Sequence, residues 1–129
     1  FGFDLTVACP KGYTPDPEWI EKGRGRVHLL NDPKEAVRDA QIVTTDVWAS
    51  MGQEKEANKR QKAFKGFQVT PALLDQASAN VRFLHCLPAH EGEEISQGLF
   101  DDRRTETVWM QAGNRLHAQK ALLEHLLAH

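Results

Sequence analysis

Residues 41–46 read Gln-Ile-Val-Thr-Thr-Asp, a nearly continuous run of apolar and β-branched side chains. A strand without alternation of apolar and polar residues is typical of a parallel sheet that is covered on both faces. A helix start precedes this run, because Asp32 can act as a cap and Pro33 suits the first helical position. We expect that helix to reach about Ala40. A helix that leads into a buried strand indicates an α/β domain.

Strand-like and helix-like segments alternate along the whole chain. The expected strands are residues 4–9, 26–30, 41–46 and 81–87, and the expected helices are residues 15–23, 32–40, 53–62 and 70–77. This alternation predicts the α/β class, as a three-layer, Rossmann-like domain with a mostly parallel sheet flanked by helices. His28 lies in a predicted strand, where we expect it to face solvent.

Size and charge exclude several kinds of protein. The chain has 129 residues and a formal charge of -2, which suits one domain with its own core. Its basic residues are scattered, so we expect a small polar ligand and neither nucleic acid nor a membrane. Two cysteines, Cys9 and Cys86, make no disulfide framework and match no zinc pattern. We expect a soluble, cytoplasmic protein without a cofactor. Because Phe1 opens the chain, we also expect a piece of a longer protein.

Polar side chains follow two of the predicted strands. Asp46 ends the run 41–46, and His85 and Cys86 lie at the exit of the run 81–87, just before Pro88. In open α/β sheets, ligands bind beyond the carboxyl ends of the strands. We therefore expect these groups to line one cleft.

The C-terminal part is expected to contribute a third group. Residues 107–110 resemble a short extended piece, and Asn114 is expected to cap the last helix, which places Arg115 at a helix start. The expected buried side of this helix consists of leucines, namely Leu116, Leu122, Leu123, Leu126 and Leu127. A carboxylate that can bind an ammonium, and an arginine that can bind an oxyanion or carbonyl, suit an enzyme that acts on an amino acid.

Residues 47–66 form a long excursion after the central strand. Residues 53–62 are good helix formers with almost no apolar stripe, so we expect a loosely docked helix held by local pairs such as Glu56 with Arg60. Both a mobile lid and an exposed helix fit this pattern. A further acidic loop, at residues 90–94, combines His90 with nearby glutamates, which we interpret as solvated groups and not as a metal site.

Three motifs together resemble a known family. Asp46-x-x-x-Ser50-Met51-Gly52, then His85-Cys86-Leu87-Pro88, then Asn114-Arg115, closely resemble the C-terminal, ornithine-binding domain of the ornithine carbamoyltransferase family. The resemblance covers essentially the whole chain. It implies transfer of a carbamoyl group from carbamoyl phosphate to the δ-amine of L-ornithine, which gives L-citrulline and phosphate.

The resemblance also implies roles for the residues of these motifs. Asp46 would bind the α-ammonium of ornithine, and Ser50 and Met51 would ride on the lid, residues 47–66. Cys86 would lie beside the δ-amine, where it would be catalytic.

Further roles belong to the turn and to the arginine. The backbone carbonyls of Cys86 and Leu87 would hold the carbamoyl amide, and His85 belongs to the same substrate-binding motif. Arg115 would polarise the carbamoyl carbonyl as a second catalytic residue.

The family's carbamoyl phosphate motifs lie in an N-terminal domain, and neither appears in this chain. The resemblance further implies that the first strand and turn of the ornithine-binding domain are missing, and that the parent is a homotrimer. We therefore expect no turnover from residues 1–129 alone. Two alternatives remain: a non-catalytic amino-acid-binding module, and a hydrolase that uses Cys86 with His85. Adjacent strand residues point to opposite faces, which disfavours the second.

Overall fold

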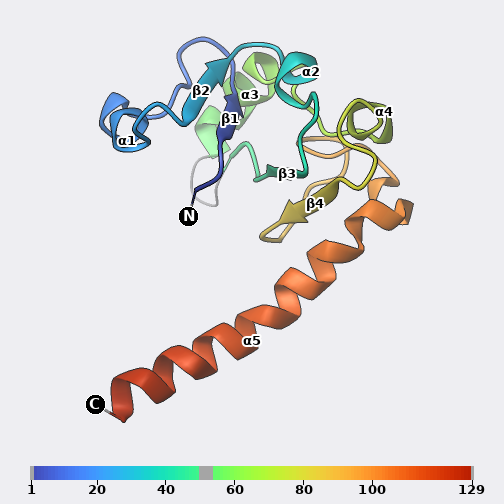
Figure 1. The fold of residues 1–129 in the computed structure, drawn as a ribbon. Coiled ribbons are helices and arrows are strands. Elements are labelled where there is room, and N and C mark those ends of the chain that lie inside the picture. Colours follow the sequence, from blue (N-terminus) through green and yellow to red (C-terminus); the bar gives the residue numbers. More distant parts are fainter. Residues whose placement is uncertain (1, 50–53, 129) are drawn as a thin grey trace.

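Four short strands form the β part of the molecule in a computed structural model that describes residues 2–49 and 54–128. The strands are β1 (Leu5–Ala8), β2 (Val27–Leu30), β3 (Ile42–Thr45) and β4 (Arg82–His85). β1 pairs with β2 and β3 pairs with β4, and both pairs are parallel. Helices connect the strands (Figure 1), so the predicted α/β class is confirmed.

The helices begin at different kinds of signal, and only some of them have a side-chain cap. They are α1 (Pro17–Lys22), α2 (Pro33–Ala36), α3 (Glu54–Ala63), α4 (Pro71–Leu74) and α5 (Glu106–Leu127), with 3₁₀ turns η1 (Leu99–Asp101) and η2 (Arg103–Thr105) before α5. The Asp32 carboxylate accepts a hydrogen bond from the backbone N–H of Lys34, and Thr70 accepts one from Leu73. α2 is shorter than expected, because it ends at Ala36 and not near Ala40.

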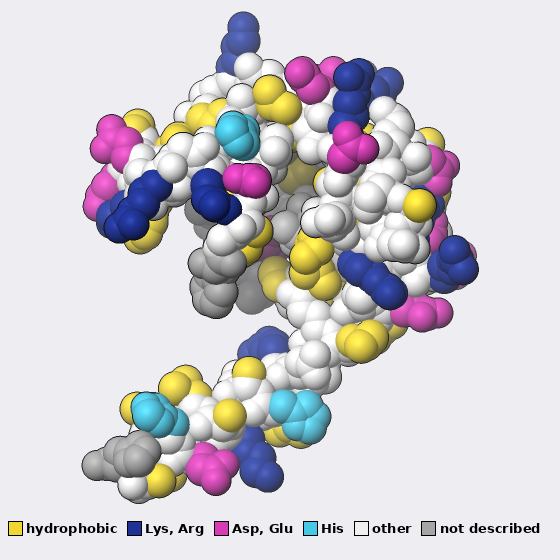
Figure 2. Space-filling view, viewed as in Figure 1, with side chains coloured by type: hydrophobic (Ala, Val, Ile, Leu, Met, Phe, Trp, Pro, Cys, Tyr) yellow, Lys and Arg dark blue, Asp and Glu magenta, His cyan; other side chains and the backbone are white. Residues whose placement is uncertain are grey.

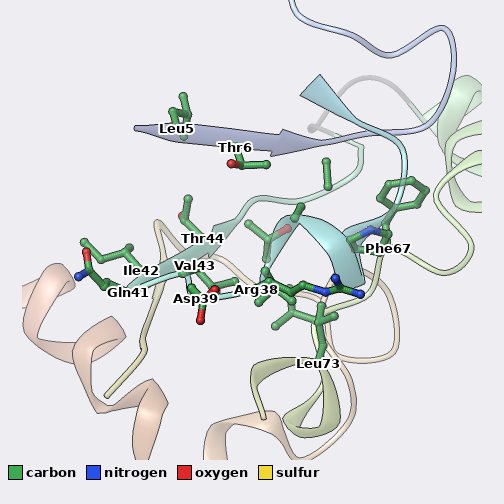
Figure 3. A pocket seen from close by; sticks show the side chains of 17 residues that line it. Leu5, Thr6, Arg38, Asp39, Gln41, Ile42, Val43, Thr44, Phe67 and Leu73 are labelled. Atoms are coloured by element: carbon green, nitrogen blue, oxygen red, sulfur yellow. The ribbon is translucent and has the colours of Figure 1, made fainter. Parts of the chain in front are cut away.

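The described strands form two separate two-stranded sheets and not one continuous sheet. A cavity of about 360 Å³ lies between them, lined on one side by β1 and on the other by β3. Figure 3 shows Leu5 and Thr6 on one side of it and Val43 and Thr44 on the other. Leu5 and Ile42, at the starts of these two strands, are 42% and 61% exposed. The two pairs are therefore separated where a continuous sheet would have hydrogen bonds.

The core lies on the side of β3 and β4. Phe83 of β4 is fully buried together with Ile95, Leu99 and Val108. Burial of such side chains stabilises a fold by about 1.5–3 kcal/mol each. Val108 belongs to the first turn of α5, so the start of this helix is anchored in the core.

The expected extended piece at residues 107–110 and the expected cap at Asn114 are wrong. α5 already begins at Glu106, which places Asn114 and Arg115 in the middle of a 22-residue helix. Tertiary contacts override the local β preference of this piece, because Val108 is fully buried and the Thr107 hydroxyl donates to the Phe83 carbonyl.

The expected burial of the C-terminal leucines is also wrong. Their exposed fractions are 69% for Leu116, 57% for Leu122, 59% for Leu123, 64% for Leu126 and 84% for Leu127. α5 projects away from the strands (Figure 1), and Figure 2 shows hydrophobic side chains along its surface. The leucine spacing is that of a packed helix, but this part of α5 has no described element against it. Within the described residues, no helix combines the length and the apolar character that crossing a membrane requires.

Candidate functional site

Asp46 and Cys86 meet at the carboxyl ends of β3 and β4. Thr45 and His85 are the last paired residues of the two strands. Asp46 and Cys86, which follow them, therefore lie next to each other. The Cys86 thiol donates a hydrogen bond to Asp46 Oδ1 over 3.3 Å. The same oxygen accepts a hydrogen bond from the backbone N–H of Val47 at 2.8 Å. The structure thus brings together two of the residues that the sequence assigned to one cleft.

Asp46 and Arg115 act on the Cys86 thiol in opposite directions. The hydrogen bond to Asp46 raises the pKa of Cys86, and partial burial and the negative charge of Asp46 add to this effect. The positive charge of Arg115 lowers the pKa of Cys86, but the net shift is upward. Cys86 is exposed and not in a disulfide. At neutral pH it is therefore a protonated thiol that can donate a hydrogen bond, and not an activated thiolate.

The turn after β4 has an unusual backbone. Leu87 has a φ of 55°, in the left-handed region, and the peptide bond between Leu87 and Pro88 is cis. A left-handed residue with a Cβ costs roughly 1–2 kcal/mol, so the surroundings must hold it. The backbone N–H of Leu87 donates to His85 Nδ1 over 2.9 Å, which ties the turn to the strand before it.

His85 faces the core and not the cleft. Its side chain is buried, and Nε2 lies 3.2 Å from Glu94 Oε1. Because Nδ1 accepts from the backbone, Nε2 carries the proton and donates to the carboxylate. If His85 contacts a substrate directly, the contact is therefore made by its backbone and not by its side chain.

The expected solvated state of the acidic loop is wrong for Glu94, which is fully buried. Its Oε1 accepts both from His85 and from the backbone N–H of His90, the latter at 2.6 Å. Possible ligand atoms of His90, Glu93 and Glu94 lie within 4.8 Å of one another. Glu94 Oε1 already accepts two hydrogen bonds from protein donors, which leaves only the buried Oε2 without a partner, so this group carries no metal assignment.

Sequence reasoning missed an aromatic cluster beside Asp46. Phe64 packs against Tyr13, Trp48 and Phe67, with ring centroids 5.0, 5.7 and 5.9 Å away. These rings follow no periodic pattern in the sequence. The only signal in the sequence is that each of these residues is aromatic, which does not predict that they form a cluster.

Arg60 of α3 joins this cluster to the Asp46 turn. Its guanidinium lies 5.6 Å from the Tyr13 ring centroid and donates to the Trp48 carbonyl at 3.3 Å. The predicted pair with Glu56 is present, with Nε 3.5 Å from the carboxylate. A cavity of about 210 Å³ is lined by Asp46, Arg60 and neighbouring residues. Ser50 and Met51, the predicted lid contacts, lie outside the described residues.

Fold and site together define a class of protein. The chain belongs to the family described as "Aspartate/ornithine carbamoyltransferase, Asp/Orn binding domain", which matches residues 1–126. Within this family, its relatives are ornithine carbamoyltransferases. The chain is 61% identical over 127 residues to the one from Chromohalobacter salexigens, covering 98% of this chain and 41% of that protein. It is 57% identical over 129 residues to the anabolic one from Pseudomonas aeruginosa, covering 100% of this chain and 42% of that protein.

Solved structures show the same relationship. The ornithine carbamoyltransferase from Pyrococcus furiosus matches with a TM-score of 0.84 and 48% identity, over 95% of this chain and 41% of that one. The anabolic enzyme from Campylobacter jejuni matches with a TM-score of 0.87 and 36% identity, over 97% of this chain and 43% of that one. The chain thus spans about two fifths of the length of these relatives.

Proposed function

We propose that this chain is the ornithine-binding part of an ornithine carbamoyltransferase. The reaction moves a carbamoyl group from carbamoyl phosphate to the δ-amine of L-ornithine and yields L-citrulline and phosphate, a step of arginine synthesis. The observation that carries this proposal is the contact between Asp46 and Cys86, 3.3 Å apart at the ends of paired strands. A carboxylate beside a neutral thiol suits a zwitterionic amino acid whose reacting amine must be uncharged.

Asp46 would bind the α-ammonium of ornithine. It follows β3 directly, and its Oδ1 already accepts two hydrogen bonds, so the position of its carboxylate is fixed before substrate binds. Cys86 would lie beside the δ-amine. A primary amine with a pKa of about 10.4 is almost wholly protonated at neutral pH, so the site must favour the neutral form. A neutral thiol does this better than a thiolate, which would stabilise the ammonium.

The amine nitrogen would then attack the carbamoyl carbon. Its lone pair forms the new C–N bond while the carbonyl electrons move onto oxygen. Collapse of this intermediate breaks the bond to the phosphate oxygen, and the departing phosphate takes up the proton that the amine nitrogen loses. The carbonyl groups of Cys86 and Leu87 would hold the carbamoyl amide. Arg115 would stabilise the developing oxyanion, a contribution whose removal typically costs roughly 10²-fold or more in rate.

Residues 47–66 would act as the lid, with Ser50 and Met51 over the amino acid. α3 supports this proposal, because the described side chains from Glu56 to Ala63 are exposed or half-buried and none is fully buried. The contacts of Arg60 and Phe64 with Trp48 join the two ends of residues 47–66 to each other, beside Asp46.

The rest of the active site would come from outside this chain. We propose that an N-terminal domain supplies the carbamoyl phosphate site and that a strand-forming segment fills the cavity between β1 and β3. The two separate strand pairs and the exposed leucines of α5 support this proposal. Assembly into a homotrimer follows from the resemblance, a cytoplasmic location was expected from the composition, and both stay predictions.

The two alternatives differ in what they require of Cys86. A cysteine hydrolase needs a thiolate and a base, but the pKa of Cys86 is raised by its bond to Asp46, and His85 is buried against Glu94. These observations disfavour the hydrolase. A non-catalytic amino-acid-binding module needs only Asp46 and the lid, so catalysis must be measured directly.

A hybrid enzyme tests the proposed function. This chain replaces the matching 127 residues of the Chromohalobacter salexigens ornithine carbamoyltransferase, to which it is 61% identical. The folded hybrid is expected to form citrulline from ornithine and carbamoyl phosphate, whereas the 129-residue chain alone is expected to form none. Aspartate in place of ornithine should give no carbamoylated product. A folded hybrid without citrulline formation, beside an active parent enzyme, would refute the proposal.

A further inference from the structure

The first turns of α5 lie along the outer edge of β4. The inner edge of β4 pairs with β3, as in the hydrogen bond from Arg82 N to the Gln41 carbonyl. In a parallel strand, alternate residues direct their backbone groups to opposite edges, so Phe83 and His85 point outward. α5 side chains meet both groups. The Thr107 hydroxyl donates to the Phe83 carbonyl at 2.6 Å, and Gln111 Oε1 accepts from the His85 N–H at 3.1 Å.

These two side chains take the place of a neighbouring strand. An edge strand leaves backbone groups without partners, and a buried unpaired group costs about 1–3 kcal/mol. The contacts also fix how far α5 is shifted along β4, because a shift by one residue would move both Thr107 and Gln111 away from their partners. The helix register is thus set by polar contacts at two points, one turn apart.

Arg115 belongs to the same face of α5. Thr107, Gln111 and Arg115 are spaced four residues apart, so they lie above one another along the helix. Thr107 and Gln111 are half-buried, whereas every described residue of α5 after Gln111 is exposed. Gln111 is therefore the last contact before the helix leaves the strands, and Arg115 lies one turn further, toward the end of β4 where Cys86 follows.

The location of Arg115 depends on the helix that carries it. Among the residues that the structure describes, the side chain of Arg115 makes no hydrogen bond. Its positive charge lowers the pKa of Cys86, and its four-residue spacing from Gln111 directs it toward the same end of β4.

We propose that Gln111 is a positioning residue, whose hydrogen bond to the backbone of His85 places the Arg115 guanidinium at the Cys86 turn. The bond joins helix and strand one residue before Cys86 and one helical turn before Arg115. In the proposed reaction, on which the catalytic part of this inference rests, Gln111 touches no substrate. It acts by holding the oxyanion-stabilising group in reach of the carbamoyl carbon.

The first test uses the 129-residue chain and needs no activity. Alkylation of Cys86 by iodoacetamide is followed from about pH 7 to pH 10 by mass spectrometry, which separates Cys86 from the buried Cys9. Arg115→Gln removes the charge that lowers the pKa of Cys86, so alkylation near pH 8 should slow by about two- to threefold. Gln111→Met, which keeps the side-chain length without an acceptor, should reproduce most of this slowing. Asp46 and Arg115 are the charged groups that act on this thiol.

Matched variants separate positioning from mere stabilisation. Gln119→Met changes an exposed glutamine of the same helix, and its alkylation rate should equal that of the unchanged chain. In the double variant with Arg115→Gln, Gln111→Met should add no further slowing, because both act through one charge. Should Gln111→Met fail to fold, Gln111→Asn withdraws the acceptor by one methylene and should shift the rate in the same direction. A folded variant at position 111 with an unchanged pH profile would overturn the proposal.

A second test uses the hybrid enzyme. Gln111→Met should lower kcat by roughly tenfold with little change in the KM for ornithine, because oxyanion stabilisation is lost and ammonium binding is kept. Gln111→Glu restores an acceptor and should recover most of kcat. An inactive hybrid with the expected thiol titration would refute the proposed function alone, and an active hybrid with an unchanged titration would refute the role of Gln111 alone.

Discussion

His85 and Cys86, at the end of β4, lie on opposite faces of the strand and have different roles. Cys86 is exposed and bonds Asp46, whereas His85 points to the core and bonds Glu94. His85 accepts a hydrogen bond from the Leu87 N–H and so stabilises the turn. Cys86 would face the proposed amino acid. Stability and chemistry at this turn therefore depend on different side chains.

Glu94 is the residue whose loss should cost most stability around this turn. It is fully buried, and its Oε1 accepts from His85 Nε2 and from the His90 backbone. Glu94→Ala should lower the free energy of unfolding by about 3 kcal/mol, because the buried His85 ring and the partly buried His90 N–H lose their acceptor. Urea denaturation followed by circular dichroism measures this loss.

The neighbouring Glu93 provides the control, because its carboxylate contacts only the exposed Gln61 among the described residues. Glu93→Ala should cost less than about 0.5 kcal/mol. Equal losses for Glu93→Ala and Glu94→Ala would contradict the buried role of Glu94.

For individual residues, the sequence predicted that Asp46 and Cys86 lie close together, because both follow parallel strands at the same edge of a sheet. It did not predict the partner of His85. Strand alternation already implied that either His85 or Cys86 faces inward, but Glu94 lies in an irregular loop whose path no periodicity describes. A buried carboxylate in such a loop looks like a solvated one in sequence.

Among the elements, α5 departs most from its prediction. Its first turns are packed, with Val108 fully buried, while its C-terminal leucines are exposed. Contacts with β4 override the local β preference of residues 107–110. The leucines do lie on a helix, as predicted, but no described surface packs against them. A helical pattern predicts which face is apolar, but it does not predict what covers that face.

The two parts of α5 should therefore respond differently to substitution in this chain. Replacing Leu122 and Leu126 together by Gln should change the free energy of unfolding by less than about 0.5 kcal/mol, since both are more than half exposed. Val108→Ala should cost about 2 kcal/mol, because it empties a buried site. Urea denaturation compares the two variants. A loss of several kcal/mol for the leucine pair would show that this part of α5 is packed.

The ion pairs of Arg104, which join η2 to the end of α4, should contribute less stability at low pH. Arg104 Nε donates to Asp102 at 2.9 Å, and its Nη1 lies 2.8 Å from Asp75. The hydrogen bond from Arg104 lowers the pKa of Asp102. A lowered pKa contributes stability that is present above the unfolded-state pKa of about 3.9 and is lost as the pH falls through the folded-state value.

Asp102→Asn should therefore reduce stability near neutral pH, and its difference from the unchanged chain should shrink as the pH falls below about 4. Urea unfolding at several pH values measures this difference. The exposed neighbouring Asp101 serves as the control, since Asp101→Asn should alter stability by less than about 0.5 kcal/mol. A difference for Asp102→Asn that stays constant with pH would contradict the ion-pair account.

For the whole molecule, the α/β class with parallel strands was predictable, because the alternation of buried strands and capped helices is a local signal. The division into two strand pairs was not. β1 and β3 are not paired, and a cavity of about 360 Å³ lies between them. The lid prediction stays open, because Ser50 and Met51 lie outside the described residues.

The whole account depends on Asp46 as the group that binds the amino acid, and the KM for ornithine of the hybrid enzyme tests this most directly. Asp46→Asn removes the charge that attracts the α-ammonium and should raise this KM by about tenfold or more. Asp39→Asn is the control, because Asp39 is exposed and has a left-handed backbone that asparagine also adopts. The account predicts an unchanged KM for Asp39→Asn, and an unchanged KM for Asp46→Asn in an active, folded hybrid would contradict it.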